Sequence, residues 1–132
     1  MSSSEARTEE GRVLAANQAL YAAFNTRDLA SMERLWAREA PVACVHPGWA
    51  AVHGRENVMA TWRAILENPD QPRVVAGAAE AYVRGEAAWV VCRELVAGSP
   101  LAATNVFVLE EGEWRITQHH SSAIAFLAED LQ

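Results

Sequence analysis

The chain contains no lysine, since all eleven of its basic residues are arginine. Schiff-base catalysis and a phosphate-binding P-loop are therefore excluded, because both need a primary amine on the chain. The two cysteines, Cys44 and Cys92, fit neither a CxxC redox motif nor the spacing of a zinc site, so we expect buried thiols and no disulfide. No apolar run reaches the length of a membrane span, and the polar N-terminal residues contain no apolar signal segment. These absences favour a soluble, cytoplasmic protein.

The composition is that of one globular domain. The chain has 132 residues, of which 51% are hydrophobic and 21% charged. The formal net charge of −6 argues against nucleic acid or an anionic membrane surface as a partner. We expect residues 1–8 to form a disordered leader and residues 9–132 to form a single domain.

Three segments have helical spacing of apolar residues. The first covers residues 9–25, the second lies between the expected N-cap Asp28 and Pro41, and the third lies between Gly54 and Pro69. Two short extended pieces, PVACVH and residues 50–53, separate the second and third helices. Four longer β-type runs follow, at residues 73–83, 87–96, 101–109 and 113–122, with turn residues between them. The pattern predicts an α+β fold in which an antiparallel meander packs on three helices.

The last hairpin decides which side chains point inward. A three-residue loop, Glu110-Glu111-Gly112, pairs Asn105 with Thr117. One face then carries Asn105, Phe107, Thr117, His119 and Ser121, and the other carries Val106, Val108, Trp114, Ile116 and His120. A two-residue loop would exchange His119 for His120, so both histidines stay candidates. Three helices can cover only one face of the sheet, and we expect a homodimer to cover the outer face.

Three stretches carry a resemblance to a known group of proteins: YAAFNTRDLASMERLWA, VHPGWAAVHGRENVMATWRAIL and ATNVFVLEEGEWRITQHHSS. They are similar to the nuclear transport factor 2-like superfamily, which includes SnoaL-like polyketide cyclases, ketosteroid isomerase and the association domain of calcium/calmodulin-dependent kinase II. The resemblance covers residues 13–122 and implies a cone-shaped curved sheet (the cystatin-like roll) with a pocket at one end. It implies no particular activity, because this fold supports many.

The resemblance also assigns positions. His46 falls where ketosteroid isomerase has its general-base aspartate, Asn105 where it has its oxyanion-hole aspartate, and Trp62 at a pocket tyrosine. Leu20 occupies the place of the catalytic tyrosine, with Tyr21 one residue away. Because the chain lacks both carboxylates, the comparison argues against steroid isomerisation. In the kinase association domain, inward arginines correspond to Arg93 and Asn105, and the histidine-rich last strand resembles TQHHSS.

The candidate site residues follow from these positions and from their chemistry. His46 is either a proton acceptor or a strand-end histidine bonded to a backbone carbonyl. Asn105 and His119 are candidates for stabilising an oxyanion, and Arg93 either anchors an acidic ligand or forms an ion pair. The expected pocket walls are Tyr21, Trp49, Trp62, Phe107 and Ser121. Adjacent strand residues point to opposite faces, so His119 and His120 cannot share a metal, and we expect neither metal nor cofactor.

Two functions remain open. The first is a small-molecule isomerase, cyclase or hydrolase acting on an apolar or acidic substrate through His46. The second is a non-catalytic module that binds a ligand or assembles with other chains. No aspartate or glutamate falls at the expected pocket positions, which favours the second.

Overall fold

A computed structural model of the protein describes residues 3–126, which form three helices and six strands. In chain order these are α1 (Ser3–Thr26), α2 (Leu29–Leu35), β1 (Ala43–Val45), β2 (Val52–His53), α3 (Arg55–Glu67), β3 (Val74–Arg84), β4 (Ala87–Val96), β5 (Ser99–Glu110) and β6 (Glu113–Ala123). The predicted α+β class is confirmed. Helix α1 begins at Ser3 rather than near Glu9, so residues 3–8 of the expected leader are helical. No helix in the described range is long and apolar enough to cross a membrane.

The strands form one sheet in the order β2-β1-β6-β5-β4-β3. The long strands β3 to β6 are the predicted antiparallel meander. The sequence did not predict that β1 joins this sheet parallel to β6, with Cys44 opposite His119 and Val45 opposite His120. This pairing places His46, the residue after β1, beside the last strand.

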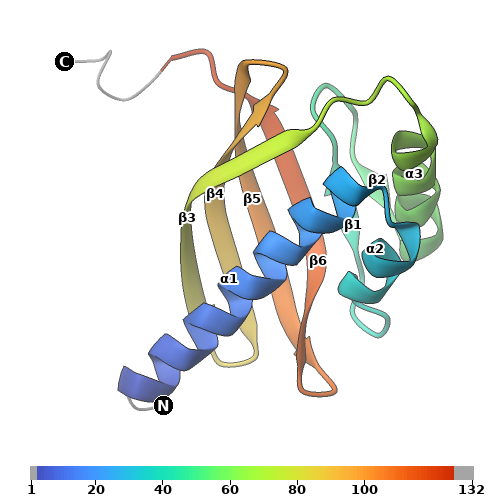
Figure 1. The fold of residues 1–132 in the computed structure, drawn as a ribbon. Coiled ribbons are helices and arrows are strands. Elements are labelled where there is room, and N and C mark those ends of the chain that lie inside the picture. Colours follow the sequence, from blue (N-terminus) through green and yellow to red (C-terminus); the bar gives the residue numbers. More distant parts are fainter. Residues whose placement is uncertain (1–2, 127–132) are drawn as a thin grey trace.

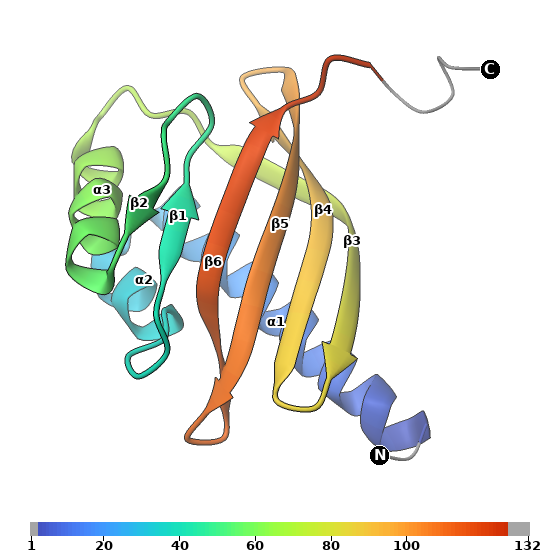
Figure 2. The ribbon, with the colours of Figure 1, turned by 180° about the vertical axis from the view of Figure 1, so that it is seen from behind.

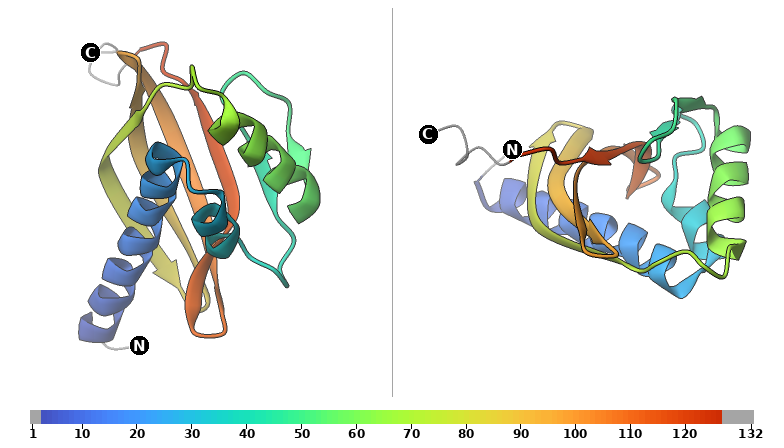
Figure 3. Two further views of the ribbon diagram at one scale, coloured as in Figure 1. Left: turned by 45° about the vertical axis from the view of Figure 1, so that its right-hand side comes forward. Right: turned by 90° about the horizontal axis from the view of Figure 1, so that it is seen from above.

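The three helices lie on one side of the sheet. Helix α1 runs along the face of β3 to β6, and α2 and α3 lie near β1 and β2 (Figure 1). Seen from above, α1 lies along one side and α3 at the end that β1 and β2 form (Figure 3). None of the three helices described lies on the opposite face of β3 to β6 (Figure 2). The core between helices and sheet contains Leu20, Met32, Trp36, Phe107 and Ile116, all fully buried.

Two irregularities in the last hairpin set its register. The connection is a two-residue loop, in which Glu111 and Gly112 both have positive φ as a type I′ turn requires. The expected three-residue loop and its pairing of Asn105 with Thr117 are therefore wrong. A bulge then places both Thr117 and Gln118 opposite Val106.

The bulge restores the inward direction of His119. Asn105 pairs with His119, which is buried, and His120 is exposed. On the turn side of the bulge, Trp114 and Ile116 are also buried, so their expected position on the outer face is wrong.

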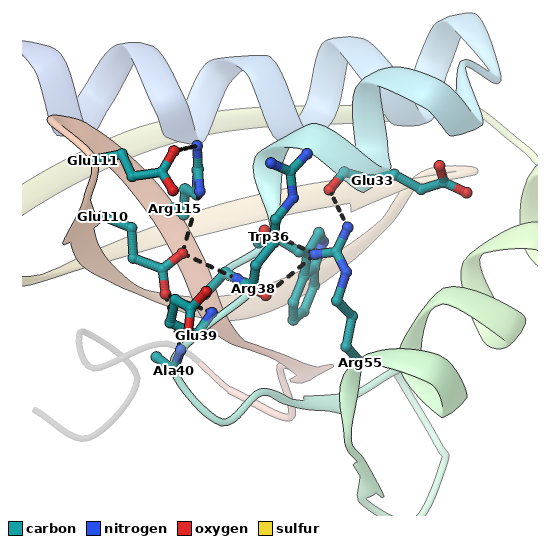
Figure 4. A network of polar contacts seen from close by, with 10 residues as sticks. Glu33, Trp36, Arg38, Glu39, Ala40, Arg55, Glu110, Glu111 and Arg115 are labelled. Carbon is teal, nitrogen blue, oxygen red and sulfur yellow. Dashed lines mark hydrogen bonds and ion pairs between the residues drawn. The ribbon is translucent and has the colours of Figure 1, made fainter.

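Two charged side chains fix the segment between α2 and β1 (Figure 4). The Glu110 carboxylate accepts hydrogen bonds of 2.9–3.0 Å from the backbone N–H groups of Arg38, Glu39 and Ala40. The guanidinium of Arg55, on α3, donates to the carbonyls of Glu33, Trp36 and Ala37 at the end of α2. Burial of Glu110 opposes its ionisation, but these N–H donors and Arg115 together lower the pKa of the carboxyl group.

The end of α1 is tied to the connection between α3 and β3. The Asn25 amide exchanges two hydrogen bonds of 2.8 Å with the backbone of Val74. Arg27 donates to the carbonyls of Leu66, Asn68 and Gln71. These contacts hold the loop residues that line the cavity described below.

Candidate functional site

A cavity of about 500 Å³ lies where α3, the loop after β1 and the ends of β3, β4 and β5 meet. This volume lies within the usual range for small-molecule sites. Its walls are mostly apolar, with the aromatic rings of Phe24 and Trp49 among them. The polar residues on its walls are His46, Asn68, Gln71, Glu94 and Ser99. Of these, His46 and Glu94 are the groups suited to proton transfer.

The imidazole of His46 is held between two indole rings. The ring centroids of Trp49 and Trp62 lie 5.0 and 4.7 Å from that of His46, both in edge-to-face arrangements. His46 Nε2 lies 2.9 Å from the Thr61 hydroxyl, which itself donates to the Val58 carbonyl. Because that hydroxyl has a single proton, Nε2–H must donate to it, and the neutral ring keeps its lone pair on Nδ1. His46 therefore has an acceptor nitrogen, Nδ1, and the Cys44 sulfur lies 3.7 Å from it.

The environment keeps His46 neutral. Burial, and secondarily the neighbouring His119, lower its pKa to about 4. Burial also lowers the pKa of His119 to about 4. Neither ring is a charged imidazolium at neutral pH, so each has one N–H donor and one acceptor nitrogen.

A buried chain of hydrogen bonds connects His119 to Glu94. His119 Nδ1 donates to Asn105 Oδ1 over 2.6 Å, and the Asn105 amide donates to Asn17 Oδ1 at 2.8 Å and to the Tyr21 hydroxyl at 3.1 Å. The Tyr21 hydroxyl donates to Glu94 Oε2 over 2.6 Å. These residues come from α1, β4, β5 and β6, so the chain of bonds joins the helix layer to the sheet.

The directions of these bonds limit what each group can do. Both N–H groups of Asn105 are already used, and His119 keeps only a lone pair at Nε2. Neither residue has a free N–H for an oxyanion, so the expected oxyanion-stabilising role finds no support in this geometry. Asn105 instead fixes the orientation of His119. Burial, then the charge of Glu94, raises the pKa of Tyr21, so its hydroxyl stays protonated and remains a donor.

The structure distributes the predicted site residues over three places. His46 and Trp49 line the cavity, and Trp49 lies at its mouth with 47% of its surface exposed. Tyr21, Trp62, Asn105, Phe107, His119 and Ser121 are buried but do not line it. Arg93 is exposed on the opposite face of β4, so its expected inward position is wrong.

Glu94 is the residue that the sequence prediction missed. Strand β4 alternates, and its buried positions are Ala88, Val90, Cys92 and Glu94. The sequence does not show which residues of β4 point inward, because the outward residues Trp89, Val91 and Leu95 are as apolar as the inward ones. The even spacing from Cys92, already expected to be buried, was the signal that could have found Glu94.

The match to a family model and the fold both identify a SnoaL-like protein. Residues 13–126 match the SnoaL-like domain family, and the chain belongs to this family. Its fold is that of the nuclear transport factor 2-like superfamily, as predicted. Family and fold support a small-molecule-binding domain.

Two solved structures illustrate the similarity. A proposed dehydratase of the NTF2-like family from Streptomyces avermitilis is 29% identical, with a TM-score of 0.84 over 91% of this chain and 99% of that one. A proposed calcium/calmodulin-dependent protein kinase type II association domain from Thiobacillus denitrificans is 33% identical, with a TM-score of 0.74 over 83% of this chain and 93% of that one.

A curated relative extends the comparison to a plant protein. The F-box protein SKIP8 of Arabidopsis thaliana is 26% identical over 122 residues, which is 91% of this chain. The matched region is 52% of that relative, so the chain spans about half its length.

Proposed function

We propose that the protein binds a small molecule in this cavity and catalyses proton transfer on it, with His46 as the proton acceptor. The observation that carries the proposal is that an unprotonated imidazole and a carboxylate, His46 and Glu94, line the same cavity. The apolar walls suit a substrate with an apolar body.

The surroundings of His46 support a base rather than an acid. The Thr61 hydroxyl holds Nε2–H, and two tryptophans restrict the ring, so the lone pair on Nδ1 has a fixed direction. A positioned base of this kind accelerates proton transfer by about 10²–10⁴-fold. Isomerisation, cyclisation and loss of water all use such a step, and the Streptomyces avermitilis relative is a proposed dehydratase.

Glu94 supplies the kind of acid–base group whose expected absence favoured a non-catalytic module. That argument depended on the absence of a second acid–base group from the pocket, and Glu94 lines the cavity wall. Binding without turnover is the alternative function, and the hydrogen–deuterium exchange experiment distinguishes it from catalysis.

Hydrogen–deuterium exchange tests the proposal without knowledge of the substrate. A panel of small apolar ketones, with and without an amine group, is incubated with the protein in D₂O, and loss of the C–H signal beside the carbonyl is followed by NMR. We expect exchange with the wild-type protein and a loss of about 100-fold or more in His46→Ala. The matched control is His53→Ala, which changes an exposed histidine. Equal rates in His46→Ala and wild type would exclude His46 as the base.

We also propose a homodimer formed through the outer sheet face. This face carries the exposed apolar residues Val75, Tyr82, Trp89, Val91 and Leu95, and no helix within residues 3–126 covers it (Figure 2). Tyr82 and Trp89 stack on each other with ring centroids 5.5 Å apart. Apolar side chains in adjacent rows of an uncovered sheet favour burial against a second copy.

Sedimentation velocity tests the dimer. We expect the wild-type chain to sediment as a dimer and Val91→Glu, at the middle of the face, to sediment as a monomer. Ala60→Glu adds the same charge on an exposed position of α3 and should leave the dimer intact. A wild-type monomer at all concentrations would contradict the proposal.

A further inference from the structure

The charge inside the cavity has the opposite sign to the one predicted. Arg93 was expected to point inward and to anchor an acidic ligand, but it is exposed on the outer face. Its neighbour Glu94 points inward and is only 5% exposed. The inner face of β4 therefore contributes an anion to the cavity.

Among residues 3–126, the hydrogen bonds to the Glu94 carboxylate come from two hydroxyl groups. Tyr21 donates to Oε2 over 2.6 Å, and Ser121 donates to Oε1 over 2.5 Å. Within residues 3–126, the ion pairs involve other carboxylates, and no arginine or histidine neutralises Glu94. A carboxylate oxygen can accept more than one hydrogen bond, so both oxygens of Glu94 retain acceptor capacity. A buried carboxylate without a counter-charge is costly and gains strongly from a cation.

The other walls of the cavity also suit a cation. None of the residues that line it in the described part of the chain is an arginine, and His46 is kept in its neutral form. Phe24 and Trp49 add aromatic rings, whose faces attract organic cations. Asn68, Gln71 and Ser99 supply the neutral polar groups. The negative net charge of the chain favours the approach of cations as well.

We propose that the cavity selects a small apolar ligand that carries a protonated amine, with Glu94 as its anchor, and rejects carboxylate ligands. This inference rests on the proposed function only in placing the ligand in the same cavity as His46. The amine forms charge-assisted hydrogen bonds with Glu94, and the apolar body lies along the aromatic and aliphatic walls. A carboxylate at the same place faces Glu94 directly and is repelled.

Three probes of one shape test the selection: 2-phenylethylamine, 2-phenylethanol and phenylacetate. Their binding to the full chain is measured by calorimetry at pH 7. We expect the amine to bind at least about tenfold more tightly than the alcohol, and phenylacetate to show no binding. The Glu94→Gln variant, which keeps the side-chain size, should lose most of the preference for the amine.

Two controls separate the charge of Glu94 from other effects. Ser121→Ala removes one donor to Glu94 but keeps the carboxylate, so the amine preference should remain. Glu80→Gln removes one exposed carboxylate and should leave the preference unchanged. Because the readout is a ratio between probes, partial unfolding of a variant does not change it.

The outcomes distinguish this inference from the proposed function. An amine that binds no more tightly than the alcohol, including no measurable binding of either, overturns the inference. The same holds if phenylacetate binds best or if Glu94→Gln keeps the preference. In each of these cases, exchange that depends on His46 would leave the proposed function standing.

Discussion

Asn105 and His119 face each other across β5 and β6, and His119 Nδ1 donates to Asn105 Oδ1 over 2.6 Å. The amide of Asn105 is fully buried and is held in turn by Asn17 and Tyr21. A group on α1 thus determines the tautomer of a histidine on the last strand. The network stabilises the fold and also fixes the orientation of the rings behind the cavity.

Replacement of Asn105 by leucine should destabilise the protein by about 2–6 kcal/mol. The side-chain size is kept, but His119 Nδ1–H and Asn17 Oδ1 lose their partner in a buried region, and each such loss costs about 1–3 kcal/mol. Urea unfolding measures the change. The control is Gln18→Leu, the same kind of exchange at an exposed position of α1, which should change the free energy of unfolding by less than about 0.5 kcal/mol. A similar small effect in Asn105→Leu would contradict the role of the network.

The free energy of unfolding should fall as the pH decreases from about 6.5 to about 4. Both His46 and His119 have a folded-state pKa of about 4, below the value of about 6.5 in the unfolded chain. The unfolded state therefore takes up protons first, and stability that is complete above pH 6.5 is lost on acidification. Each histidine contributes up to about 1.4 kcal/mol per pH unit.

Histidine variants test the origin of this slope. His119→Gln keeps a donor toward Asn105 and removes one titrating group, so it should flatten the dependence measured by urea unfolding between pH 4 and 6.5. The control variant is His53→Gln, at an exposed position, and its unfolding free energy should depend on pH as steeply as that of the wild type. An unchanged slope in His119→Gln would show that other groups cause it.

Glu110→Gln should cost about 2–3 kcal/mol of stability. The carboxylate accepts three backbone N–H groups, and hydrogen bonds to a charged group contribute about 1.5–3 kcal/mol. Glu111→Gln is a matched control, since its side chain is 74% exposed and next in sequence. Thermal unfolding compares the two, and equal melting temperatures would contradict the anchoring role of Glu110.

The acid dependence of Glu110 adds to that of the histidines. Its folded-state pKa is lowered, so its stabilising effect is present above the unfolded value of 4.5 and is lost as the pH falls below it. The Glu110→Gln variant should therefore differ least from wild type at the lowest pH.

Both thiols should resist labelling in the folded protein. Burial, then the charge of Glu94, raises the pKa of Cys44 to about 12, and burial raises the pKa of Cys92. Neither forms the thiolate that reacts with a disulfide reagent near neutral pH. We expect negligible reaction with Ellman's reagent at pH 8 and reaction of both thiols in guanidinium chloride. Rapid labelling of the native protein would contradict the burial of Cys44 and Cys92.

The sequence predicted the elements well because apolar spacing and turn residues are local signals. Asp28 caps α2 as expected, with its carboxylate accepting from the Ser31 N–H. The phase of β4 was not predictable from apolar content, because both of its faces are apolar. The parallel pairing of β1 with β6 was missed since it joins segments far apart in the chain.

The cavity was predicted more accurately at His46 and Trp49 than at its charged group. A proline-glycine turn after a short strand marked the first two residues locally. The inward carboxylate of Glu94 depends on strand phase, and its hydroxyl partners Tyr21 and Ser121 come from the two ends of the chain. Such long-range hydrogen bonds leave no trace in local spacing.

The bulge opposite Val106 has a consequence for how this family member could change over time. Deleting Thr117 alone would remove the bulge but leave Ile116 opposite Phe107, Gln118 opposite Val106 and His119 opposite Asn105. His119 and Ser121 would still point inward, and His120 would still point outward. The last strand therefore holds one residue more than its register needs, so the loss of a single codon in this stretch would be absorbed by loss of the bulge, whereas a gained codon would require a second irregularity or would reverse the facing of the rest of β6.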